Sequence, residues 1–117
     1  MIVVVLDDLL FSSKVRATAA QIGVPLVFAR SRDAVLAEVR KAPPSLVIFD
    51  LNNPRTDPIG TVTAMKADPV LRSIRTIGFV SHVDTATIDA ARRAGVDEVL
   101  PRSAFAQRLP EILSGAM

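Results

Sequence analysis

Apolar and polar positions along the chain form two patterns that alternate five times. Short, unbroken apolar runs rich in valine, isoleucine and phenylalanine predict strands that are covered on both faces. Segments with apolar residues three or four positions apart predict helices with one buried side. The predicted strands are residues 2–6, 24–29, 46–50, 75–80 and 96–100, and the predicted helices are residues 10–22, 31–41, 57–67, 84–94 and 104–113.

Residues that start and stop helices stand at the boundaries of these segments. Ser31 and Asp84 are typical N-cap residues, and Asp57 followed by a proline is typical of a helix start. Gly23 and Gly95 are typical of the position that ends a helix. The capping residues therefore support the boundaries that the apolar pattern predicts.

Two prolines and one weak strand refine the prediction. Pro25 indicates either that the second strand lies at an edge of the sheet or that the proline stands in the first turn of that strand. Pro110 lies late in the last helix and is expected to delay, kink or split it. The fifth strand is less uniformly apolar than the others, so we expect it near the opposite edge.

Alternation of strands and helices with short connections predicts an α/β fold. The expected architecture is a five-stranded, parallel, doubly wound sheet with right-handed crossovers and helices on both faces. In the flavodoxin-like order 2-1-3-4-5, the first and third strands are neighbours at the switch point where such sheets bind ligands. No linker, repeat or low-complexity segment interrupts the pattern, so residues 1–117 are expected to form a single domain.

Composition excludes several classes of function. Half of the residues are hydrophobic, but there is no tryptophan or tyrosine, so the core must be mainly aliphatic. The absence of cysteine excludes disulfides and thiolate metal sites and is compatible with a cytoplasmic location. A net charge of +2 does not indicate a nucleic-acid partner. No apolar run approaches the ~18 residues of a membrane span, and the apolar N-terminus lacks the basic start of a signal peptide.

Carboxylates follow two of the predicted strands. Asp7 and Asp8 end the first strand, and Asp50 ends the third after four apolar residues. The predicted strand order brings the three together, and three carboxylates suit an oxygen-binding cation such as Mg²⁺. Simpler interpretations remain open, because Asp50 could be a solvated residue at a strand end and the acid pair could cap the first helix.

Other polar residues follow the last two strands. Ser81 and His82 follow the fourth strand, and Arg102 follows the fifth. A hydroxyl and a fixed cation near the carboxylates would help to hold a phosphoryl group, although serine is also common in turns. His82 is the only histidine, and a lone histidine is more often a surface or packing residue than a catalyst.

The same segments argue against an enzyme or a nucleotide-binding protein. The sequence Asp7-Asp8-Leu9-Leu10 stands where a glycine-rich phosphate-binding loop would follow the first strand. With one histidine, the chain has neither a histidine metal-ligand pattern nor a recognisable Ser-His-Asp set. We therefore expect the protein not to be an enzyme.

Over nearly its whole length the chain resembles the receiver domain of two-component response regulators. Asp7 and Asp8 match the metal-binding acid pair of that family. Asp50 falls on the phosphorylated aspartate, and Asn52 falls on the position whose backbone carbonyl contacts the metal. The resemblance thus implies that Asp7, Asp8, Asp50 and Asn52 bind Mg²⁺.

The resemblance also extends to the last two strands. Ser81 matches the hydroxyl that contacts the phosphoryl group, and Arg102 takes the place of the basic residue after the fifth strand. The implied function is that of a stand-alone receiver in a phosphorelay, with Asp50 as phosphoacceptor. The implied partner is a sensor histidine kinase or another signalling protein, and a homodimer would form through residues 84–113.

Several positions depart from the family pattern and support an alternative. Arg102 replaces a lysine, and its planar guanidinium does not substitute cleanly for a point-charge ammonium. Val99 stands where an aromatic switch residue is usual, and Arg55 where a glycine is usual. The alternative is a pseudo-receiver that binds another protein without being phosphorylated, in which Arg102 would pair permanently with Asp50.

Overall fold

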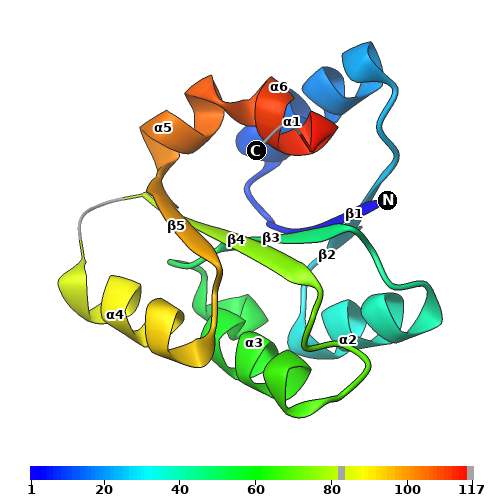
Figure 1. Cartoon of the computed structure of the whole chain (residues 1–117). Coiled ribbons are helices and arrows are strands. Elements are labelled where there is room, and N and C mark those ends of the chain that lie inside the picture. The colour runs from blue at the N-terminus through cyan, green and yellow to red at the C-terminus, as the bar shows by residue number, and fades with distance from the viewer. Residues whose placement is uncertain (82–83, 116–117) are drawn as a thin grey trace.

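A parallel sheet of five strands forms the centre of the molecule, in the order β2-β1-β3-β4-β5 (Figure 1). The computed structural model describes residues 1–81 and 84–115, so His82 lies outside the described part of the chain. The strands are β1 (Ile2–Val5), β2 (Leu26–Ala29), β3 (Leu46–Asp50), β4 (Arg75–Val80) and β5 (Glu98–Pro101). The fold class and strand order predicted from the sequence are confirmed, and the edge positions of β2 and β5 agree with Pro25 and with the mixed character of the fifth strand.

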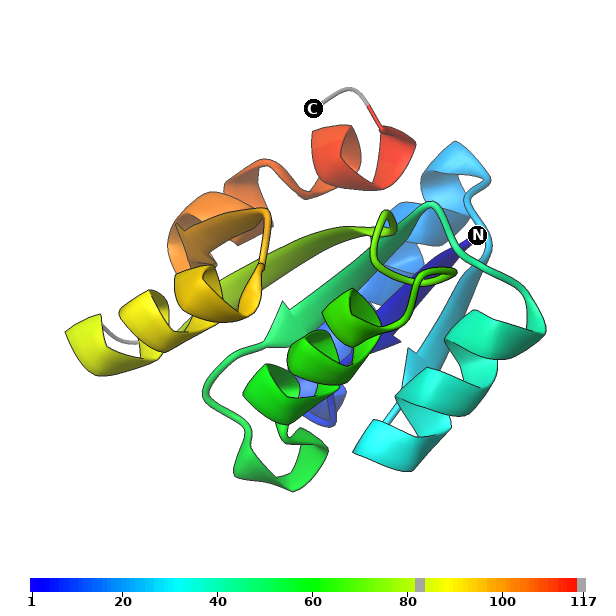
Figure 2. The same ribbon diagram turned by 60° about the horizontal axis from the view of Figure 1, so that its bottom comes forward.

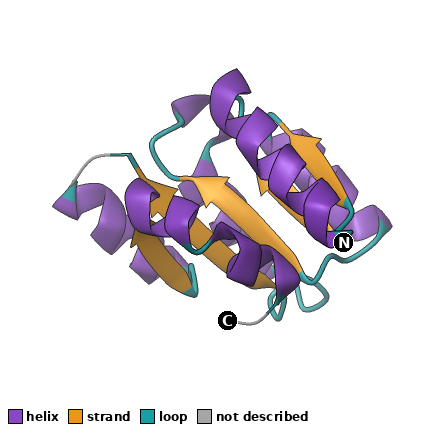
Figure 3. Ribbon diagram, turned by 90° about the horizontal axis from the view of Figure 1, so that it is seen from above, coloured by secondary structure: helices purple, strands orange, loops and turns teal. Residues whose placement is uncertain are grey.

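Helices cover both faces of the sheet. They are α1 (Leu9–Ile22), α2 (Arg32–Lys41), α3 (Pro58–Ala67), α4 (Thr85–Ala94), α5 (Arg102–Gln107) and α6 (Leu109–Ser114). Figure 2 shows α2, α3 and α4 along one face, whereas Figures 1 and 3 show α1, α5 and α6 over the other. None of the helices in the described ranges combines the length and apolar character needed to cross a lipid bilayer.

Alternate residues of the central strands point into two apolar layers, one on each face of the sheet. Val3 and Val5 of β1 point into the layer under α2, α3 and α4, whereas Ile2 and Val4 point into the layer under α1, α5 and α6. The same alternation in β3 leaves Asp50 just beyond its last buried apolar residue, Phe49. Burial of both faces therefore fixes the register of β3 and the position of its terminal carboxylate.

Two local features, one after β3 and one in the last helix, bear on the sequence-based prediction. A short 3₁₀ helix, η1 (Pro54–Thr56), follows β3, because Asn53 caps it by accepting a hydrogen bond from the Arg55 backbone nitrogen at 3.0 Å. The last helix is split at Arg108, immediately before Leu109 and Pro110. Splitting is one of the three effects predicted for Pro110, which fits at the start of α6 because this position needs no intrahelical N–H bond.

The end of β5 also differs from the prediction. The predicted strand ends at residue 100 and the predicted helix begins at residue 104, but β5 extends to Pro101 and α5 begins at Arg102 without a loop. Arg102 is consequently the first helical residue after the strand, and its backbone is fixed by the strand and the helix together.

Candidate functional site

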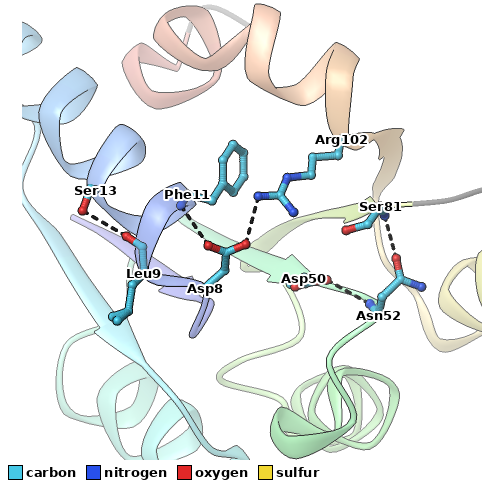
Figure 4. Close-up of polar contacts among 8 residues, drawn as sticks. All are labelled: Asp8, Leu9, Phe11, Ser13, Asp50, Asn52, Ser81 and Arg102. Atoms are coloured by element: carbon cyan, nitrogen blue, oxygen red, sulfur yellow. Dashed lines mark hydrogen bonds and ion pairs between the residues drawn. The ribbon is translucent and has the colours of Figure 1, made fainter.

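Polar side chains gather at the carboxyl ends of the central strands, as Figure 4 shows for Asp8, Asp50, Ser81 and Arg102. They come from the ends of β1, β3, β4 and β5, which lie at one edge of the parallel sheet. We call Asp7, Asp8 and Asp50 the acidic edge. The negative charges of Asp7 and Asp8 both act electrostatically on the Asp50 carboxyl.

Asp50 is partly buried at the end of β3. Burial raises the pKa of its carboxyl, and it outweighs the lowering effects of a hydrogen bond from the Asn52 backbone nitrogen and of the Arg102 charge. The Asn52 nitrogen donates to Asp50 Oδ1 at 3.0 Å. The negative charges of Asp7 and Asp8 act with burial and raise the pKa of Asp50 further. Extra negative charge on Asp50 is therefore costly unless a cation or an N–H donor compensates for it.

A close backbone approach positions the residues after Asp50. The buried Leu51 side chain lies across Gly78 of β4, where a Cβ atom would be only 2.6 Å from Leu51 Cδ1. The Leu51 backbone nitrogen also donates to the Phe79 carbonyl oxygen at 3.0 Å. Glycine at position 78 thus lets the chain after β3 lie flat against the neighbouring strand.

Asn52 joins the ends of β3 and β4. Its Oδ1 accepts a hydrogen bond from the Ser81 backbone nitrogen at 2.6 Å (Figure 4). The sequence-based prediction assigned roles to the Asn52 backbone carbonyl and the Ser81 hydroxyl, but it missed this link between the Asn52 side chain and the Ser81 backbone. Spacing along the chain gives no sign of it, because the two residues are 29 positions apart.

Asp8 has two partners that hold its carboxylate in place. It caps α1, accepting a hydrogen bond from the Phe11 backbone nitrogen at 3.1 Å, as the helix-capping interpretation of the acid pair anticipated. It also forms an ion pair with Arg102, whose Nη2 lies 3.1 Å from Asp8 Oδ2. The Phe11 hydrogen bond and then the Arg102 partner lower the pKa of Asp8.

Arg102 is directed to Asp8 by an aromatic ring. Its guanidinium carbon lies 4.3 Å from the centroid of the Phe11 ring, within the range of a cation–π interaction. Phe11 is itself held against Phe79 of β4 and Phe105 of α5, with ring centroids 5.3 and 5.9 Å away. The sequence-based alternative that paired Arg102 with Asp50 is not what the structure shows, since within residues 1–81 and 84–115 the ion-pair partner of Arg102 is Asp8.

The other member of the acid pair also has an arginine partner. Arg55 lies in η1, and its Nη1 is 3.7 Å from Asp7 Oδ2. The Arg55 side chain is 82% exposed, so water screens this pair strongly and it contributes little to stability. Each acid after β1 nevertheless has an arginine beside it.

Within residues 1–81 and 84–115, the acidic edge does not bring three side-chain ligands together around one point. Carboxylate and carbonyl oxygens are the ligands that Mg²⁺ prefers. In the described part of the chain, however, no three acidic or histidine side chains come together closely enough to hold an ion. Asp8 is turned to Arg102 instead. The metal set Asp7, Asp8, Asp50 and Asn52 stays a prediction from the resemblance.

A cavity of about 750 Å³ lies next to Arg102, between α4, β5 and α5. Ser81, Val99 and Arg102 contribute to its wall. Val99 occupies the position where the resemblance predicts an aromatic switch residue, and its small side chain leaves part of this space unfilled. Ser81 and Arg102 therefore face a hollow rather than a packed ring.

Comparison with known proteins gives matches only at the level of structure. Neither a family model nor a curated protein matches the sequence. A response regulator from Hahella chejuensis superimposes with a TM-score of 0.86 at 19% identity, covering 97% of this chain and 91% of that one. The phosphorylated cyanobacterial phytochrome response regulator RcpA gives a TM-score of 0.81 at 22% identity, covering 98% and 89%. The receiver domain of NtrX from Brucella abortus gives 0.81 at 20%, covering 99% and 97%.

These similar structures are response regulator receiver domains, and they span nearly the whole chain. Another of them is the Mn²⁺-bound form of a response regulator, with a TM-score of 0.81 at 20% identity over 97% of this chain and 91% of that one. At this level of identity the similarity shows the receiver fold.

Proposed function

We propose that this chain is a receiver-type signalling module that accepts a phosphoryl group on Asp50 in a two-component phosphorelay. The position of Asp50 carries the proposal. It ends the central strand of a receiver fold, with Asn52 hydrogen-bonded to its carboxylate and Arg102 acting on its charge. The protein would act by transmitting a signal to another protein rather than by turning over a substrate as an enzyme.

The proposed transfer uses Asp50 as a nucleophile. A carboxylate oxygen attacks the phosphorus of a phosphohistidine on the partner, a P–O bond forms, and the P–N bond breaks as the imidazole leaves and takes up a proton. The Asn52 backbone N–H, which already donates to Asp50, orients the carboxylate. The Ser81 hydroxyl and the Arg102 guanidinium are the groups proposed to contact the transferred phosphoryl group, because both stand at the adjoining strand ends.

The proposal includes a set of residues that would bind a divalent cation, and this set has still to be tested. When bound, Mg²⁺ would neutralise charge that develops on the phosphoryl oxygens. The predicted ligands are Asp7, Asp8, Asp50 and the Asn52 carbonyl, and one of them, Asp8, is paired with Arg102.

The Arg102–Asp8 ion pair favours a second candidate function. It fixes the basic residue on the acid pair instead of leaving it directed to Asp50. A pseudo-receiver would keep the fold and bind its partner without covalent modification. In that case the Asp50→Asn variant would bind the partner as well as the wild type does.

Labelling with a small phosphodonor separates the two candidates. The protein is incubated with acetyl phosphate with and without Mg²⁺, and intact mass spectrometry detects addition of one phosphoryl group. Phosphorylation of Asp50 predicts a label on the wild type and none on Asp50→Asn. If the wild type is unlabelled and Arg102→Lys is labelled, arginine in place of lysine at position 102 is what prevents phosphorylation of the wild type. If both remain unlabelled, the pseudo-receiver is the better account.

Partners, domain organisation and location follow from the same proposal. Residues 1–117 would form one receiver domain in the cytoplasm, and the partner would be a sensor histidine kinase or another signalling protein. The surface of α4, β5 and α5, within residues 84–113, is the proposed site of a homodimer. Analytical ultracentrifugation with and without acetyl phosphate tests the homodimer, and a mass that stays monomeric in both states counts against it.

A further inference from the structure

Both acids that follow β1 are neutralised by arginines of the chain itself. Arg102 Nη2 lies 3.1 Å from Asp8, and Arg55 Nη1 lies 3.7 Å from Asp7. Three carboxylates at one edge of a sheet repel one another unless cations intervene. Here the compensating positive charge comes from two guanidinium groups.

The two arginines differ in how firmly they are held. The Arg55 side chain, on the short helix η1, is 82% exposed, whereas the Arg102 side chain is 35% exposed. Arg102 opens α5 directly after β5, so its backbone is fixed at both ends. Its guanidinium also rests 4.3 Å from the Phe11 ring centroid while it donates to Asp8. Arg102 is therefore the better anchored of the two cations.

We propose that Arg102 is the resident cation of the acidic edge and competes with divalent metal ions for Asp8. A carboxylate oxygen that accepts a charge-assisted hydrogen bond from a guanidinium must give up that bond to coordinate a metal. A metal ion beside Asp8 would also stand close to the positive charge of Arg102. A divalent ion consequently enters this edge only when Arg102 leaves Asp8. The proposal relies on the proposed receiver function only for the nature of the competing ion.

Phe11 strengthens the competition. Its ring provides a face for the guanidinium, and its backbone nitrogen donates to Asp8 Oδ1 at 3.1 Å, which leaves Oδ2 directed to Arg102. The capping bond thus orients the same carboxylate that the arginine binds. A lysine at position 102 would lack the planar group that stacks on Phe11 and would hold Asp8 less firmly.

Mn²⁺ binding measures the competition without any phosphodonor. Free Mn²⁺ is followed by electron paramagnetic resonance during titration of the wild type and of Arg102→Gln. We expect Arg102→Gln to bind Mn²⁺ about tenfold more tightly, the scale on which groups that contact metal ligands alter affinity. Arg102→Lys should lie between the two proteins. Equal affinities of the wild type and Arg102→Gln would overturn the proposal.

Two control variants keep the result specific. Arg108 is 39% exposed and pairs with Glu98 at 3.6 Å, so Arg108→Gln removes a comparably exposed, paired arginine that does not contact the acid pair. The Mn²⁺ affinity of Arg108→Gln should equal that of the wild type. If Arg108→Gln and Arg102→Gln gained affinity equally, the assignment of Arg102 as the competing cation would be overturned. Arg55→Gln should gain less than Arg102→Gln, and a larger gain would make Arg55 the competing cation instead.

Folding of each variant is checked by far-ultraviolet circular dichroism before titration. If Arg102→Gln does not fold, Arg102→Lys carries the test, because tighter binding than the wild type supports competition and unchanged binding overturns it. If acetyl phosphate does not label the wild type but Arg102→Gln binds Mn²⁺ more tightly than the wild type, the proposed function is wrong and this inference still holds. The opposite result, labelling with no effect of Arg102 on Mn²⁺ affinity, would remove only the inference.

Discussion

The carboxylate of Asp50 is held in an environment that opposes its own ionisation. Burial and the charges of Asp7 and Asp8 raise its pKa, although the Asn52 N–H and Arg102 act against them. A residue whose ionised form is disfavoured in the folded protein lowers stability at neutral pH. Such a cost is expected where a group is kept for its chemistry rather than for its packing.

Replacing Asp50 by asparagine should stabilise the protein at neutral pH. Because the folded pKa of Asp50 lies above the ordinary value of 3.8, the folded state holds its proton to higher pH than the unfolded state does, and stability falls as pH rises through that interval. The gain from Asp50→Asn should therefore be present at pH 7 and disappear below pH 3.8. Urea unfolding followed by far-ultraviolet circular dichroism in metal-free buffer measures it. A gain that is independent of pH would contradict the electrostatic explanation.

Two substitutions of Asp8 separate its capping role from its charge. Asp8→Ala removes both the hydrogen bond to the Phe11 nitrogen and the ion pair, and should lower the free energy of unfolding by about 1–2 kcal/mol. Asp8→Asn keeps a capping oxygen and should lose less than about 1 kcal/mol. Thermal and urea unfolding of both variants test this order. Equal losses would mean that the ion pair, and not the cap, holds α1 at this end.

At the scale of elements, the contact between strands β3 and β4 positions the residues after Asp50. Leu51 covers Gly78, and the Leu51 nitrogen bonds to Phe79, so the chain leaves β3 along its neighbour rather than away from it. This arrangement also brings the Asn52 side chain to the Ser81 nitrogen.

A methyl group at position 78 should disturb this contact. Gly78→Ala would place Cβ 2.6 Å from Leu51 Cδ1, and the required shift should cost about 1–3 kcal/mol of stability. Leu51→Ala removes the obstacle but leaves a cavity, so each single variant is destabilised. The double variant should be more stable than the sum of the single losses implies, and a double-mutant cycle of urea unfolding measures this. Strict additivity would show that Leu51 is not the residue that restricts position 78.

The elements differ in how far the sequence determines them. Strand order, helix order and the caps Ser31, Asp57 and Asp84 could be predicted, because periodicity and capping are local properties. The helix η1 could not, since it depends on the buried side chain of Asn53. The partner of Arg102 depends on how Phe11 packs against β4 and α5, which no local pattern encodes. The sequence thus predicted that residues from the ends of β1, β3, β4 and β5 lie close together, but not which of them pair.

At the scale of the whole molecule, an apolar surface adjoins the acidic edge. Leu9 and Leu10, in the first turn of α1, are 71% and 87% exposed. They follow the acid pair directly and do not cover it. Their side chains are available to pack against another protein.

Replacing both leucines by serine should leave the isolated protein unchanged. Because neither side chain is buried, the free energy of unfolding of Leu9→Ser/Leu10→Ser should stay within about 0.5 kcal/mol of the wild type. Acetyl phosphate labelling, if present, should be equally unaffected, since the two leucines are in helix α1 and Asp50 ends strand β3. Urea unfolding and mass spectrometry test both statements. A large loss of stability would show that the two leucines stabilise α1 in the isolated protein and are not simply an exposed surface for another protein.

The hydrogen bond from the Ser81 nitrogen to Asn52 Oδ1 has a consequence for spectroscopy. Ser81 is exposed, and a solvent-facing amide ordinarily exchanges its proton with water rapidly. Here the proton is bonded to a side chain from the turn that follows β3, so its exchange depends on the chain after Asp50 remaining in place. The amide resonance of Ser81 should accordingly be a sensitive isotope-exchange reporter of anything that binds to Asp50.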